Sequence, residues 1–372
     1  MRVVHVVKAV QAAGAERHLL TLLSGLRGQN LDARLILLVE PDNPMQAYVD
    51  HAGARGIPVE RLIIRRDLDP LLYKRLAQKL RDLKPDIVHT HLLHADLYGI
   101  PAAKWSRVPV IISSRHNDNA FRRRTPIKQV NQILWRMADA GIAISDSIAR
   151  FTVEVEGAAK NKIHRIYYGL EAIEPEDRNQ ARAALLDELH LPKDSSLIGI
   201  VCRLTEQKGI PYGLQAFAKI AGEYPNAHLL IAGDGPLRSA LENETAPLKN
   251  RVHFLGWRDD TPTLMAGLDI FLAPSLWEGF GLVFLEAMAQ AVPIISSSVS
   301  AIPEVVVDGE TGLLVPPRDV NGLAEALRKL LADKPLRQYM GLQGQDRLEN
   351  HFSAARMVNE TAALYHTLLD MK

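Results

Sequence analysis

Two glutamates with seven residues between them enclose a glycine-rich turn in the second half of the chain. Glu278 and Glu286 flank the sequence Gly-Phe-Gly, and an apolar strand is expected just before them, over residues 269–273. Glu278 falls in the expected loop and Glu286 in the expected helix. A strand, a glycine loop and a helix in this order direct backbone N–H groups and the positive helix end at an anion. Two carboxylates beside such a site suit a ligand that is part phosphate and part polyol, as a nucleotide sugar is.

Short glycine turns also occur without any ligand, and both glutamates could simply be solvated. The complete string over residues 274–289, Pro-Ser-Leu-Trp-Glu-Gly-Phe-Gly-Leu-Val-Phe-Leu-Glu-Ala-Met-Ala, is more specific. It resembles the donor-binding signature of the retaining glycosyltransferases of family 4, which have the GT-B fold. The resemblance implies that the donor lies against Gly279, Phe280, Gly281, Leu282 and Val283, with Glu278 near the sugar and Glu286 near the ribose.

Two cations follow the first expected strand of the second half, in the string Cys-Arg-Leu-Thr-Glu-Gln-Lys-Gly over residues 202–209. Arg203 and Lys208 at this position could neutralise a diphosphate and stabilise the charge that develops on a leaving group. Two solvated surface charges are the alternative. The string resembles the arginine–lysine pair of the same family, which implies a catalytic role for both residues.

Two further segments of the second half resemble family elements that line the nucleotide side of the site. The turn over residues 232–236, Ala-Gly-Asp-Gly-Pro, would let the backbone of Gly233 and Gly235 approach the donor closely. Phe-Leu-Gly-Trp, residues 254–257, resembles the base-binding segment and implies donor contacts for Leu255 and Trp257. Ordinary packing is the alternative for Trp257, and Asp234 is expected to cap a helix.

The first half carries two weaker matches. Ala-Gly-Ala-Glu, residues 13–16, resembles the Gly-Gly-Ala-Glu loop of the family, with Ala13 in place of the first glycine, and implies that Gly14 approaches the donor. Ser-Arg-His-Asn, residues 114–117, resembles the segment with a histidine near the donor sugar. His116 is therefore expected to bond sugar or substrate hydroxyls, with core packing as the alternative, while Glu16 could also complement a helix dipole.

Neither a metal ion nor another cofactor is expected. His89, His91 and His94 lie close together, but no cysteine and no His-Glu-x-x-His pattern accompanies them. Asp67-Leu68-Asp69 has the form of a metal-binding Asp-x-Asp motif, yet it lies in a polar segment beside two arginines and is expected to be a solvated loop.

Alternating strands and helices must position these residues. Apolar strands are expected at 3–7, 34–39, 86–89, 110–113 and 140–144, and again at 197–202, 227–231, 252–254, 269–273 and 292–296. Amphipathic segments at 16–26, 71–83, 127–137, 209–221, 236–244, 282–290 and 320–331 are expected helices. Such alternation predicts parallel sheets covered on both faces. The fold class is therefore α/β: two Rossmann-like, doubly wound domains facing a cleft, the GT-B arrangement.

The domain boundaries follow from an acidic, proline-containing stretch at 171–179, which is expected to be the linker. Residues 1–172 form the expected acceptor-binding domain and residues 173–352 the donor-binding domain. The resemblance implies that a last helix, from about residue 353 to residue 372, crosses back to the first domain. Charge also divides the chain: residues 1–175 hold 26 Lys and Arg and 18 Asp and Glu, a net charge of +8, whereas the remainder has a net charge of −7.

The composition is that of a soluble globular protein, with 47% hydrophobic and 23% charged residues in a chain of 372. One cysteine, Cys202, excludes an internal disulfide and is expected to be a small buried side chain. No signal peptide is expected because the first residues run straight into a strand. No apolar stretch of about 18 residues is present, so no membrane span is expected. These features favour a cytoplasmic protein and give no indication of nucleic-acid binding.

The resemblance implies a retaining glycosyltransferase that uses a nucleoside diphosphate sugar, with UDP the expected carrier, and a glycan, lipid-linked or small-molecule acceptor. A nucleotide-sugar epimerase of similar fold and a non-catalytic nucleotide-sugar binder are the alternatives. Basic and apolar residues mixed over 121–136 could contact an anionic membrane, which would make the protein peripheral on the inner face. Ser-Ala-Ile-Pro-Glu, residues 300–304, departs from the Gly-Gly-x-Pro-Glu of the family, so an unusual donor preference is expected.

Overall fold

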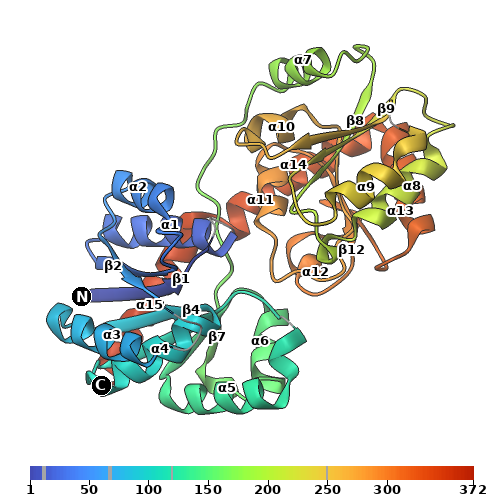
Figure 1. Ribbon diagram of the computed structural model, residues 1–372. Helices are drawn as coiled ribbons and strands as arrows, with labels where there is room; N and C mark the ends of the chain where they lie inside the picture. Colours follow the sequence, from blue (N-terminus) through green and yellow to red (C-terminus); the bar gives the residue numbers. More distant parts are fainter. Residues whose placement is uncertain (11–13, 66–68, 119, 249) are drawn as a thin grey trace. The chain divides into compact units, whose positions relative to one another are not determined.

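The protein divides into two compact units, each built around its own sheet (Figure 1). Unit 1 comprises Met1–Glu171 and Ser353–Lys372, and unit 2 comprises Ala172–Phe352. The computed structural model describes residues 1–10, 14–65, 69–118, 120–248 and 250–372, with the side chains of residues 120 and 121 left out.

Unit 1 holds a seven-stranded, all-parallel sheet in the order β3-β2-β1-β4-β5-β6-β7. Its strands are β1 (Arg2–Lys8), β2 (Asp32–Val39), β3 (Val59–Ile63), β4 (Ile87–His91), β5 (Val110–Arg115), β6 (Ala140–Ala143) and β7 (Ile163–Arg165). Its helices are α1 (Gly14–Gly28), α2 (Gln46–Ala54), α3 (Pro70–Leu83), α4 (Leu92–Trp105), α5 (Thr125–Met137), α6 (Asp146–Glu154) and α15 (Ala354–Asp370), with short 3-10 turns η1 (Ala120–Arg123) and η2 (Lys160–Lys162).

Strand β1 explains how this sheet carries a hydrophobic core on each face. Val3 and Val7 point into one core with α1 and α15, and Val4 and Val6 point into the other with α3 and α4. A parallel strand buried on both faces reads as a continuous apolar run, as β1 does apart from His5. His5 is fully buried and lies on the same face as Val3 and Val7.

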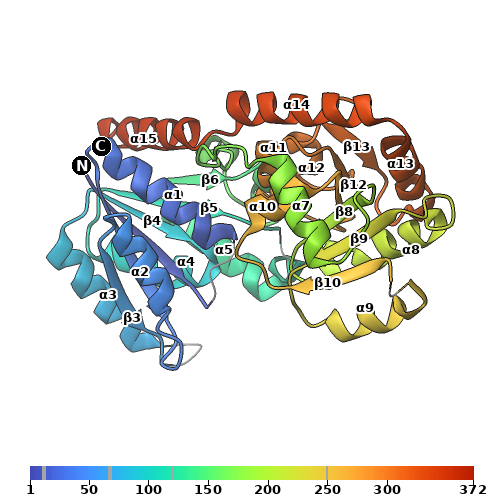
Figure 2. The same ribbon diagram turned by 90° about the horizontal axis from the view of Figure 1, so that it is seen from above.

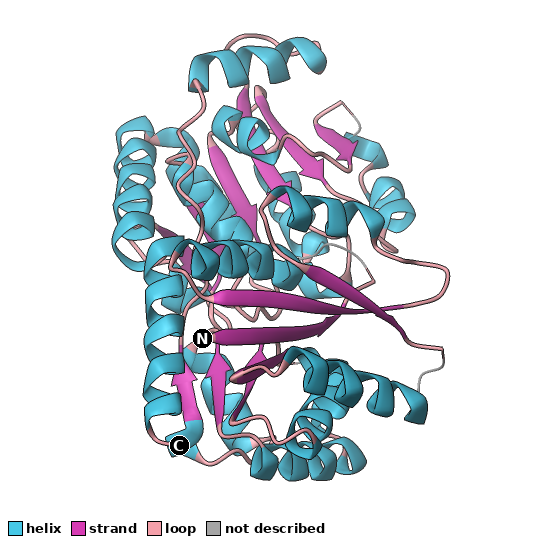
Figure 3. Ribbon diagram, turned by 90° about the vertical axis from the view of Figure 1, so that its left-hand side faces the viewer, coloured by secondary structure: helices cyan, strands magenta, loops and turns pink. Residues whose placement is uncertain are grey.

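Unit 2 holds a six-stranded parallel sheet in the order β10-β9-β8-β11-β12-β13. Its strands are β8 (Ser196–Val201), β9 (Ala227–Ala232), β10 (Val252–Gly256), β11 (Ile270–Ala273), β12 (Ile294–Ser297) and β13 (Gly312–Val315). Its helices are α7 (Arg178–Glu188), α8 (Ile210–Ile220), α9 (Arg238–Glu244), α10 (Thr261–Gly267), α11 (Leu282–Ala289), α12 (Ile302–Val305), α13 (Val320–Ala332) and α14 (Lys334–His351), with turns η3 (Glu206–Lys208) and η4 (Ala246–Leu248). In both units helices cover both faces of the sheet (Figure 3).

The predicted parallel, doubly wound α/β architecture is confirmed in both units. Strands β3, β7 and β13 were not predicted: β3 (Val-Glu-Arg-Leu-Ile) and β7 (Ile-His-Arg) mix polar with apolar residues, and β13 (Gly-Leu-Leu-Val) has only four residues. The linker was expected over 171–179 but ends before Arg178, where α7 begins. Asp177 caps this helix by accepting from the N–H groups of Asn179 and Gln180. Strand β4 extends to His91 instead of ending at residue 89.

The C-terminal helix α15 belongs to unit 1 and lies beside α1 (Figure 2). Its start is attached to the segment that precedes unit 2, because Ala354 N–H donates to the Leu170 carbonyl at 2.8 Å. Gly25 of α1 allows the close approach, since a Cβ there would overlap the Val358 side chain. Unit 1 is therefore completed by a segment that follows unit 2 in the sequence.

Candidate functional site

The loops that follow β8, β9, β10 and β11 carry the expected donor-binding residues of unit 2. Parallel strands end at the same edge of a sheet, so these loops are neighbours although up to eighty residues separate them. Arg203 and Lys208 follow β8, Gly233 and Gly235 follow β9, Leu255 lies in β10 with Trp257 directly after it, and Glu278 follows β11. Unit 2 thus gathers all the predicted residues of its own sequence at one edge.

An ion pair between Lys208 and Glu278 joins two of these loops. Lys208 Nζ lies 2.5 Å from Glu278 Oε2, and both side chains are largely buried. Backbone contacts hold the same two loops together, since Leu276 N–H donates to the Gln207 carbonyl at 2.7 Å. Gly209 permits the contact, because at its φ of +58° a Cβ would overlap the carbonyl oxygen of Pro274. A cation and a carboxylate are therefore held at a fixed spacing beside the edge of the sheet.

Helix α11 begins at this ion pair with an open N-terminus. Gly281 occupies the N-cap position with a φ of +85°, and no side chain caps the helix. The first N–H groups of a helix have no partner within it and carry its positive dipole end, so an anion is stabilised there. Phe280 anchors the loop by packing edge-on against Phe352 at 5.6 Å, and Glu286 lies half-buried in the second turn.

The loops after β8 and β9 are joined by backbone hydrogen bonds. Gly233 N–H donates to the Gly256 carbonyl at 2.6 Å, and Leu204 N–H donates to the Asp234 carbonyl at 2.9 Å. At the φ of +125° found for Gly233, a Cβ would overlap the carbonyl oxygen of Cys202. The expectation that Asp234 caps a helix is wrong: the N-cap of α9 is Leu237, and Asp234 pairs with Arg238 instead.

Two predicted residues of unit 2 present exposed side chains. Trp257 is 60% exposed and only its Nε1–H is engaged, donating to Asp259 at 2.9 Å, so ordinary packing does not explain this residue. Arg203 is also exposed, and its side chain makes no hydrogen bond or ion pair with any described residue. The Cys202 thiol lies beneath the loops, where burial raises its pKa to about 12, so it is not a nucleophile at neutral pH.

Comparison with known families identifies the chain. The family described as "Glycosyl transferases group 1" matches residues 195–333, and "Glycosyltransferase Family 4" matches residues 12–172. The chain belongs to the family 4 glycosyltransferases of GT-B fold. The two matches cover most of both units, so the relationship includes unit 1, where the sequence motifs are weaker.

The names of two relatives of this glycosyltransferase refer to glycan synthesis. It is 29% identical to the capsular polysaccharide biosynthesis glycosyltransferase CapM of Staphylococcus aureus, over 92% of each chain. It is 28% identical to the UDP-Gal:alpha-D-GlcNAc-diphosphoundecaprenol alpha-1,3-galactosyltransferase of Escherichia coli, over 98% of this chain and 96% of the relative. Among solved structures, Anabaena Alr3699/HepE in complex with UDP and glucose has a TM-score of 0.88 at 21% identity, over 99% of this chain and 100% of that one.

His116 of the glycosyltransferase is buried in unit 1, and its ring makes hydrogen bonds that the sequence did not indicate. It follows β5, is 8% exposed, and both ring nitrogens have partners: Nε2 lies 3.0 Å from His91 Nδ1, and Nδ1 lies 2.5 Å from the Tyr168 hydroxyl. Burial lowers its pKa to about 3. In this structure the His116 ring therefore has no free nitrogen with which to make the expected hydrogen bond to a sugar hydroxyl.

The other residues predicted in unit 1 lie around the start of α1 and α3. Gly14 is exposed and begins α1, Glu16 is buried, and Ala13 lies outside the described residues. Asp67 and Leu68 also lie outside them. Asp69 is 4% exposed and caps α3 by accepting from the Leu71 and Leu72 N–H groups, so the prediction that it is a solvated loop residue is wrong.

Sequence reasoning missed two buried polar groups in unit 1 of the transferase. His5 joins His89 and His91, and one nitrogen of each ring lies within 4.8 Å of the others, whereas His94 lies in α4 outside this trio. The alternation of His89 and His91 next to a strand bearing His5 was the available signal. A second group was not signalled at all, because its members Asp96, Arg115, Arg122 and Glu156 are far apart in the sequence.

This second group is a buried ion network beneath His116. The Arg115 Nε–H and an Arg122 N–H donate to the two oxygens of Glu156, each at 2.6 Å, and Arg115 also pairs with Asp96. The Arg115 guanidinium lies 4.5 Å from the centre of the Trp135 ring. Burial alone would raise the pKa of Glu156, but the charges and hydrogen bonds of Arg115 and Arg122 outweigh it and lower that pKa.

Among the described residues no helix is long and apolar enough to span a membrane.

Proposed function

We propose that the protein is a retaining hexosyltransferase that takes its sugar from a UDP-sugar and passes it to a glycan or lipid-linked acceptor. Unit 2 is proposed to bind the donor and unit 1 the acceptor. The choice of UDP is supported by the relative named for UDP-Gal and by the fold neighbour solved with UDP and glucose. The observation that carries the proposal is the Lys208–Glu278 pair at the open N-terminus of α11.

Residues of unit 2 are proposed to bind the diphosphate, the sugar, the ribose and the base of the donor. Arg203, Lys208 and the first N–H groups of α11 are proposed to hold the diphosphate, since cations and a helix N-terminus both stabilise phosphate. Glu278 accepts hydrogen bonds from the sugar hydroxyls and Glu286 from the ribose hydroxyls. Leu255 and Trp257 line the base, and Gly233 and Gly235 bring the backbone of their loop to the nucleotide.

The proposed chemistry needs no protein nucleophile. The acceptor oxygen attacks the anomeric carbon on the face from which the diphosphate leaves, so the new C–O bond forms as the sugar–phosphate bond breaks. The acceptor hydroxyl proton passes to the departing phosphate oxygen. Lys208 and Arg203 stabilise the charge that builds on that phosphate in the transition state, which is where a fixed cation lowers the barrier. Glu278 orients the sugar for this attack.

Thermal unfolding in the presence of single nucleotide sugars tests the donor. UDP-glucose, UDP-galactose, UDP-N-acetylglucosamine, GDP-mannose and ADP-glucose are compared with their free nucleoside diphosphates. A ligand at about 100 times its dissociation constant adds about 2.7 kcal/mol, a readily measured shift. Stabilisation by a UDP-sugar that is lost in Lys208→Ala supports the proposal, and stabilisation by none of these compounds contradicts it.

Product analysis separates the proposal from its alternatives. The donor found by the thermal screen is incubated with and without a total polar-lipid extract as the acceptor source, and both sugar and nucleotide products are followed. An epimerised nucleotide sugar formed without acceptor would indicate an epimerase, and binding without any turnover would indicate a non-catalytic binder. Activity is expected to survive excess chelator, because the proposed diphosphate clamp consists of protein cations. Loss of activity in chelator with rescue by Mn²⁺ or Mg²⁺ would contradict that mechanism.

The outer face of α5 supports a membrane-linked acceptor and a peripheral location. Val130 is 37% and Ile133 54% exposed on this helix, Arg136 is exposed one turn after Ile133, and Arg124 is exposed at the N-cap of the helix. Exposed apolar residues flanked by cations can lie on an anionic lipid surface, where each cation contributes about 1 kcal/mol. We propose that this face contacts the membrane that carries the acceptor.

Vesicle co-sedimentation tests this membrane contact. The protein is expected to pellet with vesicles containing phosphatidylglycerol at low salt, less at high salt, and not with neutral vesicles. Ile133→Asp should abolish pelleting. Leu342→Asp is the matched control, because Leu342 of unit 2 is 56% exposed and lies on α14. Equal, negligible pelleting with both vesicle types at low salt would leave a soluble acceptor as the better proposal.

A further inference from the structure

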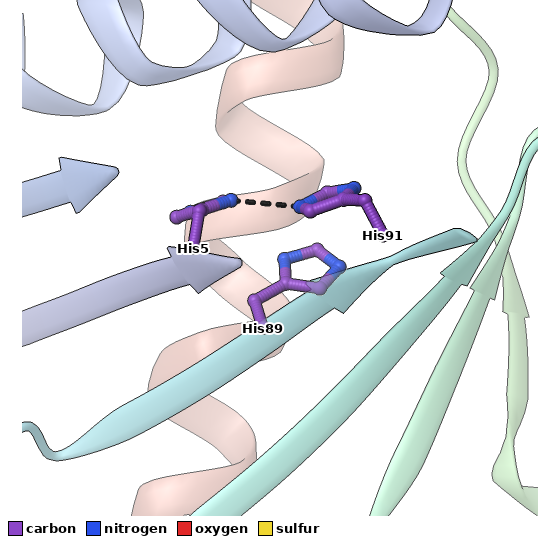
Figure 4. Close-up of side chains that lie close together, drawn as sticks. All are labelled: His5, His89 and His91. Carbon is purple, nitrogen blue, oxygen red and sulfur yellow. Dashed lines mark hydrogen bonds between the residues drawn. The ribbon is translucent and has the colours of Figure 1, made fainter. Parts of the chain in front are cut away.

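A run of buried polar rings crosses the core of unit 1 from the C-terminal helix to the loop after β5. His5 lies on β1, His89 and His91 lie on β4, and Tyr365 of α15 covers them. Figure 4 shows the three histidine rings close together above β1 and β4. His116 continues the run beyond His91. None of these five residues is more than 8% exposed.

Hydrogen bonds link these side chains into one continuous chain. Ser114 Oγ lies 2.7 Å from His89 Nε2, and His89 Nδ1 lies 2.6 Å from the Tyr365 hydroxyl. That hydroxyl lies 3.3 Å from His5 Nε2, and His5 Nδ1 lies 2.9 Å from His91 Nε2, the bond drawn in Figure 4. His91 Nδ1 then reaches His116 Nε2, and His116 Nδ1 reaches Tyr168. Each of the four rings thus uses both of its nitrogens.

The number of protons restricts how this chain can be arranged. A neutral imidazole has one N–H donor and one acceptor nitrogen, and a hydroxyl can donate once and also accept. Each ring must therefore donate on one side and accept on the other. If all protons point one way along the chain, or all the other way, every bond is made and the Tyr365 hydroxyl both donates and accepts; if that hydroxyl accepted from both His89 and His5, its own buried proton would have no partner in the chain. The tautomer of each ring is consequently coupled to that of its neighbours.

The geometry fits such a neutral chain better than a metal site. The His5 and His91 rings are within 12° of parallel and joined by a nitrogen–nitrogen hydrogen bond, and the His89 and His91 rings are tilted by 33° with their centres 4.2 Å apart. Both nitrogens of each of the three rings already have hydrogen-bond partners, so a metal ion would have to displace bonds of the chain to gain its ligands. Burial also lowers the pKa of His5 to about 3 and that of His91 well below its usual value, which keeps the rings neutral.

The Ser114 end of the chain favours one direction. His89 is the only hydrogen-bond partner of the Ser114 hydroxyl among the described residues, so the Ser114 proton is satisfied only by donation to His89 Nε2. The Tyr365 hydroxyl carries this direction on to His5, because it accepts from His89 Nδ1 and donates to His5 Nε2. In this direction all four histidines carry their proton on Nδ1.

We propose that Tyr365 is a positioning residue that acts through His5 and His91 to hold His116 in the Nδ1–H tautomer. The ring of His116 is then fixed between His91 and Tyr168, which orients the segment that follows β5. This inference rests on the proposed function, together with the expectation from the family resemblance that the segment after β5 lies near the donor sugar. Removing the Tyr365 hydroxyl separates His89 from His5. The remaining chain from His5 to Tyr168 can then run in either direction.

Nuclear magnetic resonance of the full-length protein with ¹⁵N-labelled histidine tests the proposal directly. Long-range proton–nitrogen correlations distinguish Nδ1–H from Nε2–H rings, and single histidine substitutions assign the signals. The wild type should show His5, His89, His91 and His116 neutral at neutral pH, all with the proton on Nδ1. Tyr365→Phe should convert His116 to a mixture of both tautomers.

Tyr98→Phe is the matched control. It removes another buried hydroxyl of unit 1, one that accepts from the Asp69 N–H at 2.8 Å and is not a member of the histidine chain, so the His116 signal should not change. An Nε2–H signal for His116 in the wild type would overturn the proposal, as would an unchanged signal in Tyr365→Phe. Stoichiometric zinc, copper, nickel or iron in the purified protein, measured by elemental mass spectrometry, would assign the three histidines to a metal instead.

A second readout links the tautomer to the donor. If Tyr365→Phe populates both His116 tautomers equally, the competent fraction is about one half, and the apparent dissociation constant of the donor rises about twofold. The spectra need no donor, so they decide the proposal even where the donor assignment fails. If Tyr365→Phe does not fold, the wild-type tautomers decide it alone.

Discussion

The polar residues of unit 1 and unit 2 are held in opposite ways. In unit 2 they lie in loops at the edge of the sheet, where glycine backbones and one ion pair, Lys208–Glu278, fix their positions. In unit 1 they lie within the core, where four histidines and the network around Arg115 replace apolar packing. The first arrangement leaves groups available to a ligand. The second satisfies its groups internally, so it orients the segment above it and contributes to stability.

Acidification should produce the largest difference between the two units. Burial lowers the pKa of His5, His18, His89, His91 and His116, to about 3 for His5 and His116. The unfolded rings bind protons below about pH 6.5, whereas the folded rings do not. Stability is therefore full above about pH 6.5 and falls as the pH approaches the folded values, by up to about 1.4 kcal/mol per histidine and pH unit.

Hydrogen exchange read by mass spectrometry at about pH 7.5 and about pH 5.5 resolves the two units. After correction for the intrinsic exchange rates, peptides of unit 1 should lose more protection than those of unit 2. The comparable group in unit 2 is smaller: burial lowers the pKa of the buried His228 to about 4 and lowers that of the half-buried His253, against five buried histidines in unit 1. An equal loss in both units would contradict the assignment of neutral histidines to the core of unit 1.

Glu156→Ala tests the ion network and should cost about 3–5 kcal/mol, the range for removing one partner of a buried pair. The substitution leaves the buried guanidinium groups of Arg115 and Arg122 without their shared carboxylate. Glu154→Ala on the same segment is the control, because Glu154 is exposed. Urea unfolding measures both variants, and equal midpoints would remove the network from the account of unit 1 stability.

Lys208→Ala should reduce turnover by about 10²-fold or more, equivalent to about 2.7 kcal/mol of transition-state stabilisation. Arg203→Ala should act in the same direction, because its exposed side chain is available to the diphosphate. Lys219→Ala, an exposed lysine in the last turn of α8, should retain wild-type turnover. Steady-state release of UDP from the identified donor is the measurement. Wild-type turnover in folded Lys208→Ala would remove the clamp from the mechanism.

Gly233→Ala should destabilise unit 2 by about 1–3 kcal/mol, because its φ of +125° is unfavourable for alanine and the new Cβ would overlap the Cys202 carbonyl oxygen. Gly222→Ala is the matched control, since nothing lies within 4 Å of the Cβ it would add. Thermal unfolding compares the two variants. A midpoint in Gly233→Ala as high as that of the control would show that the backbone does not constrain this loop.

The loops of unit 2 that carry the predicted donor residues could be anticipated because these residues are close to one another along the chain. Glu278, Gly281 and Glu286 fall within one loop and its following helix, and Arg203 and Lys208 fall within another. Each string shows its strand, turn and helix directly in the residue pattern. The edge strands β3, β7 and β13 were not recognised in this way, since β3 and β7 mix charged with apolar residues and β7 and β13 have only three and four residues.

The site of unit 1 could not be anticipated from the same kind of pattern. His116 was expected to bond sugar or substrate hydroxyls, with core packing as the alternative, and both of its nitrogens are engaged by buried partners. Asp69 was expected in solvent and is a buried helix cap. In both cases the segment after a strand or before a helix was identified, whereas the direction and partners of the side chain were not.

The sequence by itself determined the alternation of strands and helices, the family and the residues of the loops in unit 2, because each rests on residues that are near neighbours in the chain. Only the tertiary structure decided that His5 lies beside His89 and that Tyr365 covers both, across 84 and 276 residues of chain from His89. Parallel strands are paired through long crossovers, so residues adjacent on a sheet face carry no common local pattern. Burial then determines which of them are neutral, bonded or free, and burial is a property of the folded chain alone.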